Sequence, residues 1–381
     1  MSASQAPACR VGVIGDSTHP RSYGHGIHLA WVGLPQVEIV ALSDPDAGAH
    51  AQRAAECGAR RTYTDHAEML AAVDLDFVSI CPHYYARHAE WLHDCIAAGV
   101  KGIYVEKPMT RTLVEADAVV AAAEAAGVRI AVAHQWGRYL PSLDALRALV
   151  REGGIGDLRV MRGHGKCDAR GGAHDTFVLG THVFDLMRSI AGDVAWVSGQ
   201  VRQNGRALSA ADIAEGPEGI GLLAGDELFG AFGFHSGVTA TFHSFADPEA
   251  ATQTVGLEVW GTRGGASVRN GGAEVAVYPL PAVRPFESGA RWEPIEAPVY
   301  DSQGRELSGD AIGHRTNQRA AEDLVAACAE GRDPVSSARS ATAALEMAMA
   351  IFESERVQRR VELPLATREN PFEVWRLRGR A

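Results

Sequence analysis

The sequence predicts a two-domain α/β protein in which a doubly wound parallel sheet precedes an α+β domain with a large, mainly antiparallel open sheet. The first observation is the length, since 381 residues at about 150 residues per domain suggest two domains. The second is the first third of the chain, where short apolar strands alternate with helices. The third is a change near residue 155 to longer strand-like runs with few helices between them. We place the two domains at 9–140 and 141–381.

Six short apolar runs in the first domain are typical of buried parallel strands. They cover residues 10–15, 37–44, 59–63, 77–81, 103–105 and 129–133. Helices are expected between them at 28–34, 65–72, 86–98 and 113–126, with Asp65 as the cap of the second. Such a doubly wound sheet binds ligands at the carboxyl ends of its strands.

The second domain begins with a helix over 141–152 and continues with long extended runs, which favour a largely antiparallel sheet. The strands are expected at 158–163, 194–203, 227–234, 238–245, 255–261 and 274–278. One helix, at 177–190, interrupts them early. Residues 281–312 read as a long surface excursion, and two helices follow at 316–328 and 338–355.

The composition excludes several classes of protein. Hydrophobic residues make up 46% of the chain and charged residues 22%, which is ordinary for a folded globular protein. The net charge of -11 argues against binding to nucleic acid. The 6 cysteines include no CxxC pair and favour a reducing, cytoplasmic location. Neither a signal peptide nor a run of apolar residues long enough to cross a membrane is evident.

A glycine-rich turn, GDSTHPRSYGHG at residues 15–26, follows the first strand. Gly15 allows a tight turn, and Gly24 and Gly26 let the backbone approach a pyrophosphate. Asp44 ends the second strand about 20 residues after Gly24, which is the spacing of an acid that binds a ribose 2′-hydroxyl. Such an acid repels a 2′-phosphate, so the pattern predicts NAD rather than NADP. A glycine-rich turn without a ligand is the alternative.

Other side chains at the strand ends complete the expected cofactor site. They are Ser17, His25, Pro82, His83, Glu106 and Lys107. The histidines of the turn, His19 and His25, and the nearby His28 do not indicate a metal, since no carboxylate or cysteine clusters with them. We therefore expect no metal.

Two residues are candidates for the chemistry. Lys107, in the segment YVEKP, closes the fifth strand, where its ammonium can polarise a substrate oxygen; a solvated lysine at a strand end is the alternative. His182 falls on one face of a helix with Val178 and Asp185. A histidine is a natural acceptor for the proton of a hydroxyl that loses a hydride. His182 as a buried structural histidine is the alternative, and Asp185 is expected to be structural.

These motifs together resemble the Gfo/Idh/MocA family, which comprises glucose–fructose oxidoreductase and inositol dehydrogenase-like enzymes. The resemblance rests on the strand–glycine turn, on Glu106-Lys107-Pro108, on the GG…GxHxxD segment at 171–185 and on the closing segment 337–363. It covers residues 10 to 365, nearly the whole chain. It implies a Rossmann domain, a second domain whose open sheet builds dimers or tetramers, and NAD(P)-linked chemistry. It also implies that Lys107 binds substrate and that His182 is the acid/base.

The sequence departs from the family pattern in two places. The family usually has an aspartate four residues before the histidine, where this chain has Val178. Asp175 is the nearest acid, and we expect it to replace that aspartate as the third catalytic residue, with His182 acting alone as the alternative. The glycine turn is also longer than usual.

The sequence therefore predicts an NAD-dependent oxidoreductase that takes a hydride from a CH–OH group of a sugar, polyol or glycoside. Many hydrogen-bonding side chains are expected to line the substrate, in addition to Lys107 and His182: His134, Gln135, Arg138, Asp168, Arg170, His174 and Asp175. Trp136 and Tyr139 are expected to stack on a sugar face. One alternative is a redox-neutral enzyme with tightly bound NAD, which oxidises a sugar transiently for elimination, epimerisation or glycoside cleavage. Another is a non-catalytic nucleotide sensor. A homodimer or homotetramer is expected.

Overall fold

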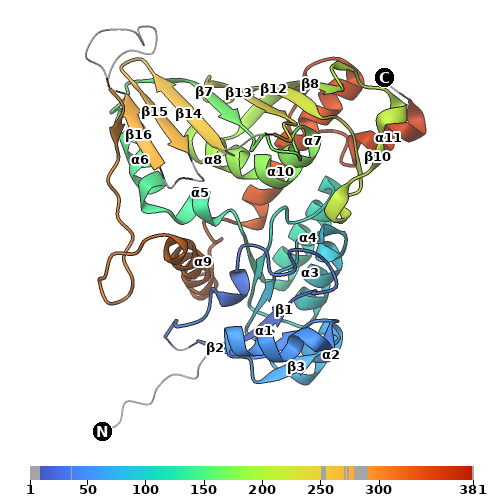
Figure 1. The fold of residues 1–381 in the computed structure, drawn as a ribbon, viewed down its shortest axis with the longest axis vertical. Helices are drawn as coiled ribbons and strands as arrows, with labels where there is room; N and C mark the ends of the chain where they lie inside the picture. The colour runs from blue at the N-terminus through green and yellow to red at the C-terminus, as the bar shows by residue number, and fades with distance from the viewer. Residues whose placement is uncertain are drawn as a thin grey trace. The chain divides into compact units, whose positions relative to one another are not determined.

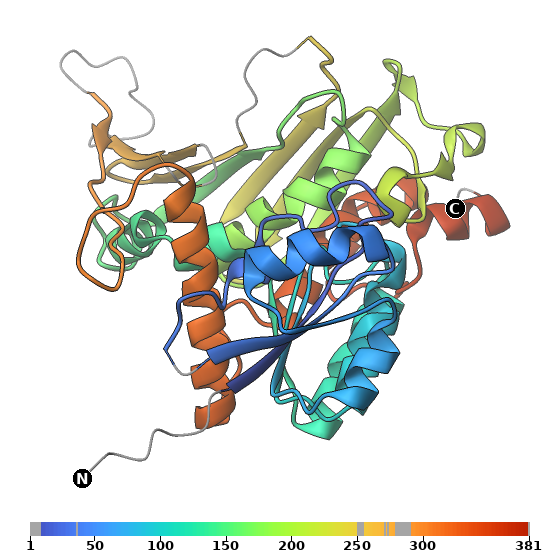
Figure 2. The ribbon, with the colours of Figure 1, turned by 60° about the horizontal axis from the view of Figure 1, so that its bottom comes forward.

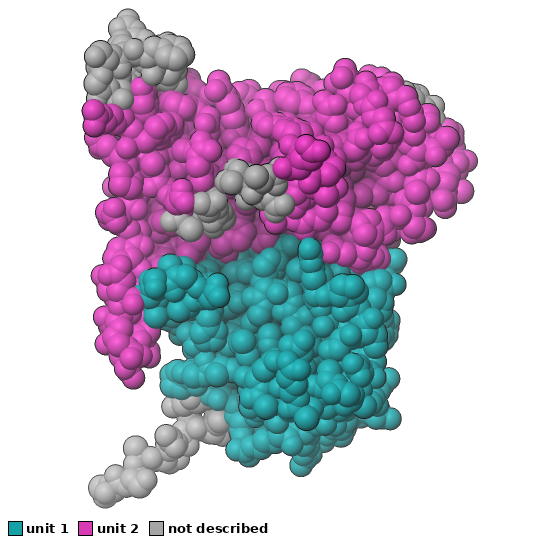
Figure 3. All heavy atoms as spheres, in the orientation of Figure 1, with its two compact units in different colours: residues 1–111, 115–135, 307–339 teal, residues 112–114, 136–306, 340–381 magenta. Residues whose placement is uncertain are grey.

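The computed structural model describes residues 9–35, 37–249, 255–269, 272, 274–278 and 291–379. The chain divides into two compact units (Figure 3). The first unit comprises residues 1–111, 115–135 and 307–339, and the second comprises 112–114, 136–306 and 340–381. A late segment of the sequence, 307–339, thus belongs to the first unit. Among the described residues, no helix has both the length and the apolar character that crossing a bilayer requires.

The first unit is built on a sheet of six parallel strands in the order β3-β2-β1-β4-β5-β6. They are β1 (Cys9–Ile14), β2 (Val37–Ser43), β3 (Arg61–Tyr63), β4 (Phe77–Ile80), β5 (Gly102–Val105) and β6 (Arg129–Val132). This confirms the doubly wound parallel sheet. The strand order reverses between β1 and β4, the point at which such sheets bind their ligands.

Helices cover both faces of this sheet (Figure 2). They are the 3-10 turns η1 (Ile27–Leu29), η2 (Ala47–Ala49) and η3 (Tyr85–Arg87), with α1 (His50–Cys57), α2 (His66–Ala72), α3 (His88–Ala97), α4 (Leu113–Ala126) and α9 (Asp310–Glu330). Asp65 caps α2 as expected, because its carboxylate accepts the amide hydrogens of Ala67 and Glu68. Helix α9 packs against β5, β6 and η1, so a distant segment completes this layer.

The prediction of a helix at 28–34 is wrong, because no regular α-helix forms there. Only the single turn η1 forms, followed by hydrogen-bonded turns up to Leu34. Gly26 precedes it in the left-handed conformation (φ 74°) and Gly33 follows with φ 80°. Two left-handed glycines seven positions apart leave little room for regular helix. The buried ring of Trp31 fixes the segment by donating its indole N–H to Ser79 Oγ (2.8 Å).

The second unit contains the large sheet that the sequence predicts. Its order is β17-β16-β15-β14-β7-β13-β12-β8-β18, with β9 paired to β8. Only the β7–β13 pair is parallel among its described pairings. The strands are β7 (Leu158–His164), β8 (Val194–Gln203), β9 (Arg206–Ala207), β12 (Glu227–Phe234), β13 (Thr239–Phe245), β14 (Gly256–Gly261), β15 (Gly265–Arg269), β16 (Glu274–Tyr278), β17 (Glu293–Pro294) and β18 (Val361–Glu362).

Strand β15 and a separate small hairpin were not anticipated. The hairpin pairs β10 (Ala214–Glu215) with β11 (Leu222–Leu223). Of the expected excursion at 281–312, residues 281–290 lie outside the described residues. The described remainder holds β17, an isolated bridge between Tyr300 and Glu306, and the first residues of α9. Helix α9 begins at Asp310, six residues before the predicted start.

Helices α8 (Thr181–Ala191) and α10 (Ala338–Val357) cover one face of the large sheet (Figure 1). Glycines in the strands let these two helices pack closely against the sheet. A Cβ at Gly163 of β7 would lie 2.7 Å from Val183 Cγ1 on α8, and one at Gly230 of β12 would lie 2.8 Å from Ile351 Cδ1 on α10. The remaining helices are α5 (Gln135–Tyr139), α6 (Pro141–Arg151), α7 (Ala173–Asp175) and α11 (Pro371–Arg378).

The continuous helix expected at 177–190 is interrupted. The short helix α7 passes into a π turn, Thr176–Gly180, before α8 begins. A π turn bonds residue i to i+5 and so changes the angular register of the side chains. The expected regular α-helix from residue 177 is therefore wrong, because Val178 lies in the π turn and His182 in α8.

Candidate functional site

In the first unit, the predicted cofactor residues follow the carboxyl ends of the parallel strands. Gly15 follows β1, Asp44 follows β2, Pro82 follows β4 and Glu106 follows β5. The turn 15–26 starts where the strand order reverses between β1 and β4. This edge is where a dinucleotide binds in sheets of this type.

Close packing explains the glycines of this turn. A Cβ at Gly15 would lie 2.2 Å from Tyr23 Oη, so the tyrosine ring rests directly on the backbone. A Cβ at Gly24 would lie 2.3 Å from His83 Nε2 and 2.5 Å from Glu106 Oε1. The turn is thus folded back against the ends of β4 and β5.

Asp44 is fully buried and surrounded by donors from this turn. Its carboxylate accepts hydrogen bonds from the Ser17 amide (3.0 Å), Ser17 Oγ (2.8 Å), Tyr23 Oη (2.7 Å) and the Asp46 amide (2.9 Å). A carboxylate offers about four acceptor positions, so protein groups saturate this one. Burial, and then the hydrogen bond to Asp44, raise the pKa of Tyr23, which keeps its hydroxyl a donor. A ribose can bond to Asp44 only by replacing one of these donors.

Glu106 is the second anchor of the turn and is also fully buried. It accepts the His25 amide hydrogen (2.9 Å), contacts His25 Nδ1 (2.9 Å) and accepts the Lys107 amide hydrogen (3.2 Å). His83 Nε2 lies 3.4 Å from Oε2. Burial alone would raise the pKa of Glu106, but the adjacent His25 and His83 imidazoles lower it well below its usual range.

The expectation that no carboxylate lies near the histidines of the turn is wrong. A carboxylate does lie among the turn's histidines, namely Glu106 beside His25. The two residues are 81 positions apart, so local spacing cannot reveal the contact; only the parallel pairing of β1, β4 and β5 brings them together.

Lys107 and His134 lie at the ends of β5 and β6. Lys107 is only 2% exposed, so it is not a solvated lysine at a strand end. Its peptide bond to Pro108 is cis. His134 and the adjacent Gln135 are also buried. His88 supports the neighbouring loop, with its Nε2 2.8 Å from the carbonyl oxygen of Pro82.

In the second unit, α5 packs against the start of α8. His182 is 1% exposed, and the Trp136 ring lies 5.0 Å from its imidazole, tilted by 36°. One turn further on, Asp185 accepts a bidentate pair from Arg138, with both distances 2.6 Å. Ser340 Oγ adds a bond of 2.8 Å to the same carboxylate. Asp185 is therefore engaged by the guanidinium of Arg138 and the hydroxyl of Ser340.

Asp175, on α7, is fully buried and only partly satisfied. Its Oδ2 accepts hydrogen bonds from Ser244 Oγ (2.6 Å) and the Cys167 amide (3.2 Å). Its Oδ1 has no hydrogen-bond partner among the described residues. Burial raises the pKa of Asp175, and the hydrogen bond from Ser244 only partly offsets this. Neither Ser244 nor Cys167 was singled out from the sequence, since both contacts depend on tertiary folding.

Two other predicted substrate residues, Asp168 and His174, lie beside side chains that can carry the opposite charge. Asp168 accepts a bidentate hydrogen-bond pair from Arg170. Burial opposes ionisation of Asp168, but the hydrogen bonds from Arg170 lower its pKa to about 2. His174 Nε2 lies 3.4 Å from Glu218 Oε2, and Tyr139 is buried on α5.

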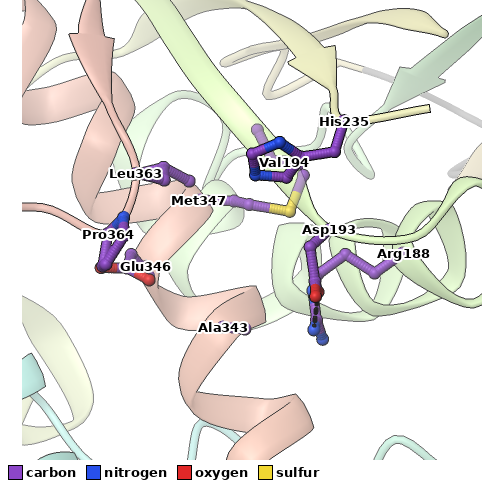
Figure 4. A pocket seen from close by; sticks show the side chains of 9 residues that line it. All are labelled: Arg188, Asp193, Val194, His235, Ala343, Glu346, Met347, Leu363 and Pro364. Atoms are coloured by element: carbon purple, nitrogen blue, oxygen red, sulfur yellow. Dashed lines mark hydrogen bonds and ion pairs between the residues drawn. The ribbon is translucent and has the colours of Figure 1, made fainter. Parts of the chain in front are cut away.

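A surface hollow of about 310 Å³ also occurs in the second unit (Figure 4). It lies between α8, the start of β8 and α10, and includes none of the predicted site residues. It is lined by Arg188, Asp193, Val194, His235, Ala343, Glu346, Met347, Leu363 and Pro364. Its most prominent charges are already paired, since Arg188 donates to Asp193 (2.5 Å).

Comparison with known families identifies both parts of the chain. Residues 9–134 match a family described as "Oxidoreductase family, NAD-binding Rossmann fold". The class of protein is therefore an NAD-binding oxidoreductase. Residues 143–267 match the C-terminal domain described as "GFO/IDH/MocA C-terminal domain". The chain belongs to the Gfo/Idh/MocA family, which confirms the resemblance seen in the sequence.

Individual relatives cover nearly the whole chain. D-apiose dehydrogenase from Paraburkholderia graminis is 28% identical over 370 residues, covering 90% of this chain and 88% of its own. 1,5-Anhydro-D-fructose reductase from Ensifer adhaerens is 28% identical over 349 residues, with coverage of 88% and 98%. The fold matches the crystal structure of an oxidoreductase domain protein from Kribbella flavida, with a TM-score of 0.75, 23% identity and coverage of 94% and 100%.

Proposed function

We propose that this chain takes a hydride from a CH–OH group of a sugar, polyol or glycoside and transfers it to NAD. The family is one of NAD-binding oxidoreductases, and two relatives that span the chain are named for acting on sugars. The observation that carries the proposal is the burial of Lys107. A buried ammonium at the carboxyl end of a Rossmann strand lies where a reacting oxygen can be stabilised.

The first unit fits the cofactor. Gly15 and Pro82 follow β1 and β4, between which the strand order reverses, and this supports a role for both in cofactor binding. Asp44 follows β2 and is the candidate ribose acid. Ser17, Gly24, His25, Gly26, His83, Glu106 and Lys107 complete the set that we propose to surround NAD. Bound NAD supplies the acceptor for a hydride. We propose residues 9–140 as this NAD domain and 141–381 as the domain for substrate and assembly.

We assign three roles to the chain's own side chains. The imidazole of His182 accepts the hydroxyl proton as the carbon loses its hydrogen as hydride and the C–O bond becomes a carbonyl. The Lys107 ammonium stabilises the partial negative charge on that oxygen. Asp175 replaces the aspartate that the family carries at the position of Val178 and favours the protonated form of His182. Trp136, His134, Arg138, Asp168 and His174 are the proposed substrate contacts.

The test is a panel of sugars and polyols incubated with NAD, with free NADH and oxidised product both quantified. Co-purified nucleotide is measured first. We expect equal amounts of NADH and product for the wild type and neither for Lys107→Met. Lys101→Met is the matched control, since Lys101 lies just before the same strand with an exposed side chain paired to Asp76. Product without free NADH would favour the redox-neutral alternative, and NAD binding without turnover on any substrate would favour a sensor.

We also propose that the chain assembles as a homodimer or homotetramer. Phe229 on β12 and Phe245 on β13 are 45% and 44% exposed. Gly230, next to Phe229, faces α10, and Phe242, three positions before Phe245, packs on Phe184 of α8. Because side chains alternate along a strand, the rings of Phe229 and Phe245 point to the opposite face of the sheet. Exposed aromatic residues on a broad sheet are typical of an interface. Light scattering at micromolar concentration tests this, and a monomer would contradict it.

The cytoplasm remains our proposed location. All six cysteines are free thiols, in keeping with a reducing compartment. Cell fractionation of the tagged protein tests this, with recovery outside the cytoplasm as the contradicting result.

A further inference from the structure

Three side chains of the set that we propose to surround NAD also form a cluster of potential metal ligands in the first unit. His25 from the glycine turn, His83 after β4 and Glu106 after β5 each offer one potential ligand atom, and these three atoms all lie within 4.8 Å of one another. Imidazole nitrogen and carboxylate oxygen are the usual ligands of Zn²⁺ and of neighbouring first-row metals. With metal–ligand distances of about 2.0–2.1 Å, tetrahedral ligand atoms lie about 3.3 Å apart.

Two spacings in the cluster are already close to that value. His25 Nδ1 lies 2.9 Å from Glu106 Oε2, and His83 Nε2 lies 3.4 Å from the same oxygen. The latter nitrogen is buried and forms no hydrogen bond within the described residues. A buried polar atom without a partner is costly, and a cation between the ring and the carboxylate would satisfy it.

The surroundings hold the cluster in place. The amide hydrogens of His25 and Lys107 bond to Glu106 and thereby orient its carboxylate, as outer-shell groups do in metal centres. Gly24 has no side chain, and a Cβ at this position would lie 2.3 Å from His83 Nε2. The space beside this nitrogen therefore stays open. The chain therefore forms a cradle in front of the donor atoms that a larger residue would obstruct.

We propose that His25, His83 and Glu106 bind one divalent first-row transition-metal ion of the Zn²⁺ class. Two neutral imidazoles and one carboxylate supply three ligands and a single negative charge. Three protein ligands leave a coordination position for water or another small ligand. Because His25, His83 and Glu106 also belong to the proposed NAD set, metal binding is measured on protein without nucleotide, and its outcome does not depend on hydride transfer.

Cobalt(II) is the probe, because its visible spectrum reports the geometry of its ligands. The protein is first freed of metal with a chelator and then titrated with Co²⁺, and with Zn²⁺ in a competition experiment. We expect one equivalent to bind with the spectrum of a low-coordinate nitrogen and oxygen site. His83→Ala and Glu106→Gln should each weaken binding by 100-fold or more, while the far-UV circular dichroism stays that of the wild type.

The matched control is His66→Ala. His66, Glu90 and Asp94 form the other group of potential ligands among the described residues, and His66 Nε2 lies 2.7 Å from Asp94. We expect this variant to bind Co²⁺ as the wild type does. Loss of binding in His66→Ala with retention in His83→Ala would overturn the proposal, as would binding that none of the variants changes. Zn²⁺ should also raise the melting temperature of the wild type but not of His83→Ala, and equal shifts in both would contradict the site.

Discussion

Two fully buried aspartates, Asp44 in the first unit and Asp175 in the second, are satisfied very differently. Four protein donors saturate Asp44, whereas Asp175 has donors on Oδ2 and an unpaired Oδ1. A saturated carboxylate holds its own loop in shape. A half-satisfied one has acceptor capacity left for a proton or a ligand, and burial raises its pKa. The carboxylate of Asp44 therefore holds the glycine turn in shape, whereas that of Asp175 keeps one oxygen as an unused acceptor among the described residues.

The largest expected effect is a loss of kcat on substitution of His182, the residue that Asp175 is proposed to support. His182→Ala should lower kcat by about 10³-fold, within the range for general acid–base groups, while the Kd for NAD changes by no more than a few-fold. Steady-state kinetics with NAD titration calorimetry measures both. His243→Ala, on the exposed face of β13, is the control. A kcat near that of the wild type in His182→Ala would make this histidine structural.

Asp175→Asn should lower kcat by about 10²-fold and shift the pH profile of kcat. Asp44→Asn should leave the shape of that profile unchanged, which makes the two variants a direct test of the comparison. An unshifted profile with unchanged kcat in Asp175→Asn would mean that His182 acts alone.

The same variant should be more stable than the wild type at neutral pH. Since burial raises the folded-state pKa of Asp175, this group contributes stability below its unfolded value of about 3.9, and that contribution is lost as the pH rises through the folded-state pKa. Thermal melts should therefore show a higher Tm for Asp175→Asn at pH 7 and a smaller difference near pH 4. A lower Tm at pH 7 would show that the ionised carboxylate is well satisfied.

At Asp44 we expect an effect of about tenfold on the ratio of the affinities for NAD and NADP. An acid at this position repels a 2′-phosphate, so the wild type should prefer NAD over NADP by tenfold or more, about 1.4 kcal/mol. Asp44→Asn should reduce the ratio of the Kd for NADP to the Kd for NAD. Calorimetric titration with both nucleotides measures it, and a wild-type preference for NADP would contradict the role of Asp44.

The smallest effect on NAD binding is expected at Tyr23, whose hydroxyl donates a hydrogen bond to Asp44 that a ribose hydroxyl would replace. Tyr23→Phe removes one hydrogen bond to Asp44 and so destabilises mainly the form without nucleotide. We expect NAD to bind several-fold more tightly and the nucleotide-free protein to melt at a lower temperature. Weaker NAD binding would show that the tyrosine stays on Asp44 in the complex.

Regular elements were predictable from the sequence because their signals are local. The bounds of α4, β8, β12 and β16 agree with the predicted ranges, and Asp65 caps α2 as its position indicated. Alternating apolar residues and a capping side chain act within a few positions. The short turn η1 and the π turn before α8 were missed, since glycine conformation and packing override helical periodicity there.

The environments of the site residues were much less predictable. Asp44 was recognised by its spacing, but its bond to Tyr23 comes from the fold of the glycine turn. Ser244, which holds Asp175, is 69 residues away in the chain. Sequence patterns therefore identified which residues to consider, and tertiary structure determined which of them are already satisfied.

Net hydride transfer to NAD is tested by following a deuterium atom from a substrate labelled at the reacting carbon. The best substrate of the panel is turned over with excess NAD, and the nicotinamide and the product are analysed by mass spectrometry. We expect one deuterium in free NADH for each molecule of oxidised product. Deuterium returned to the product, with no reduced nicotinamide released, would contradict net oxidation and establish a redox-neutral reaction instead.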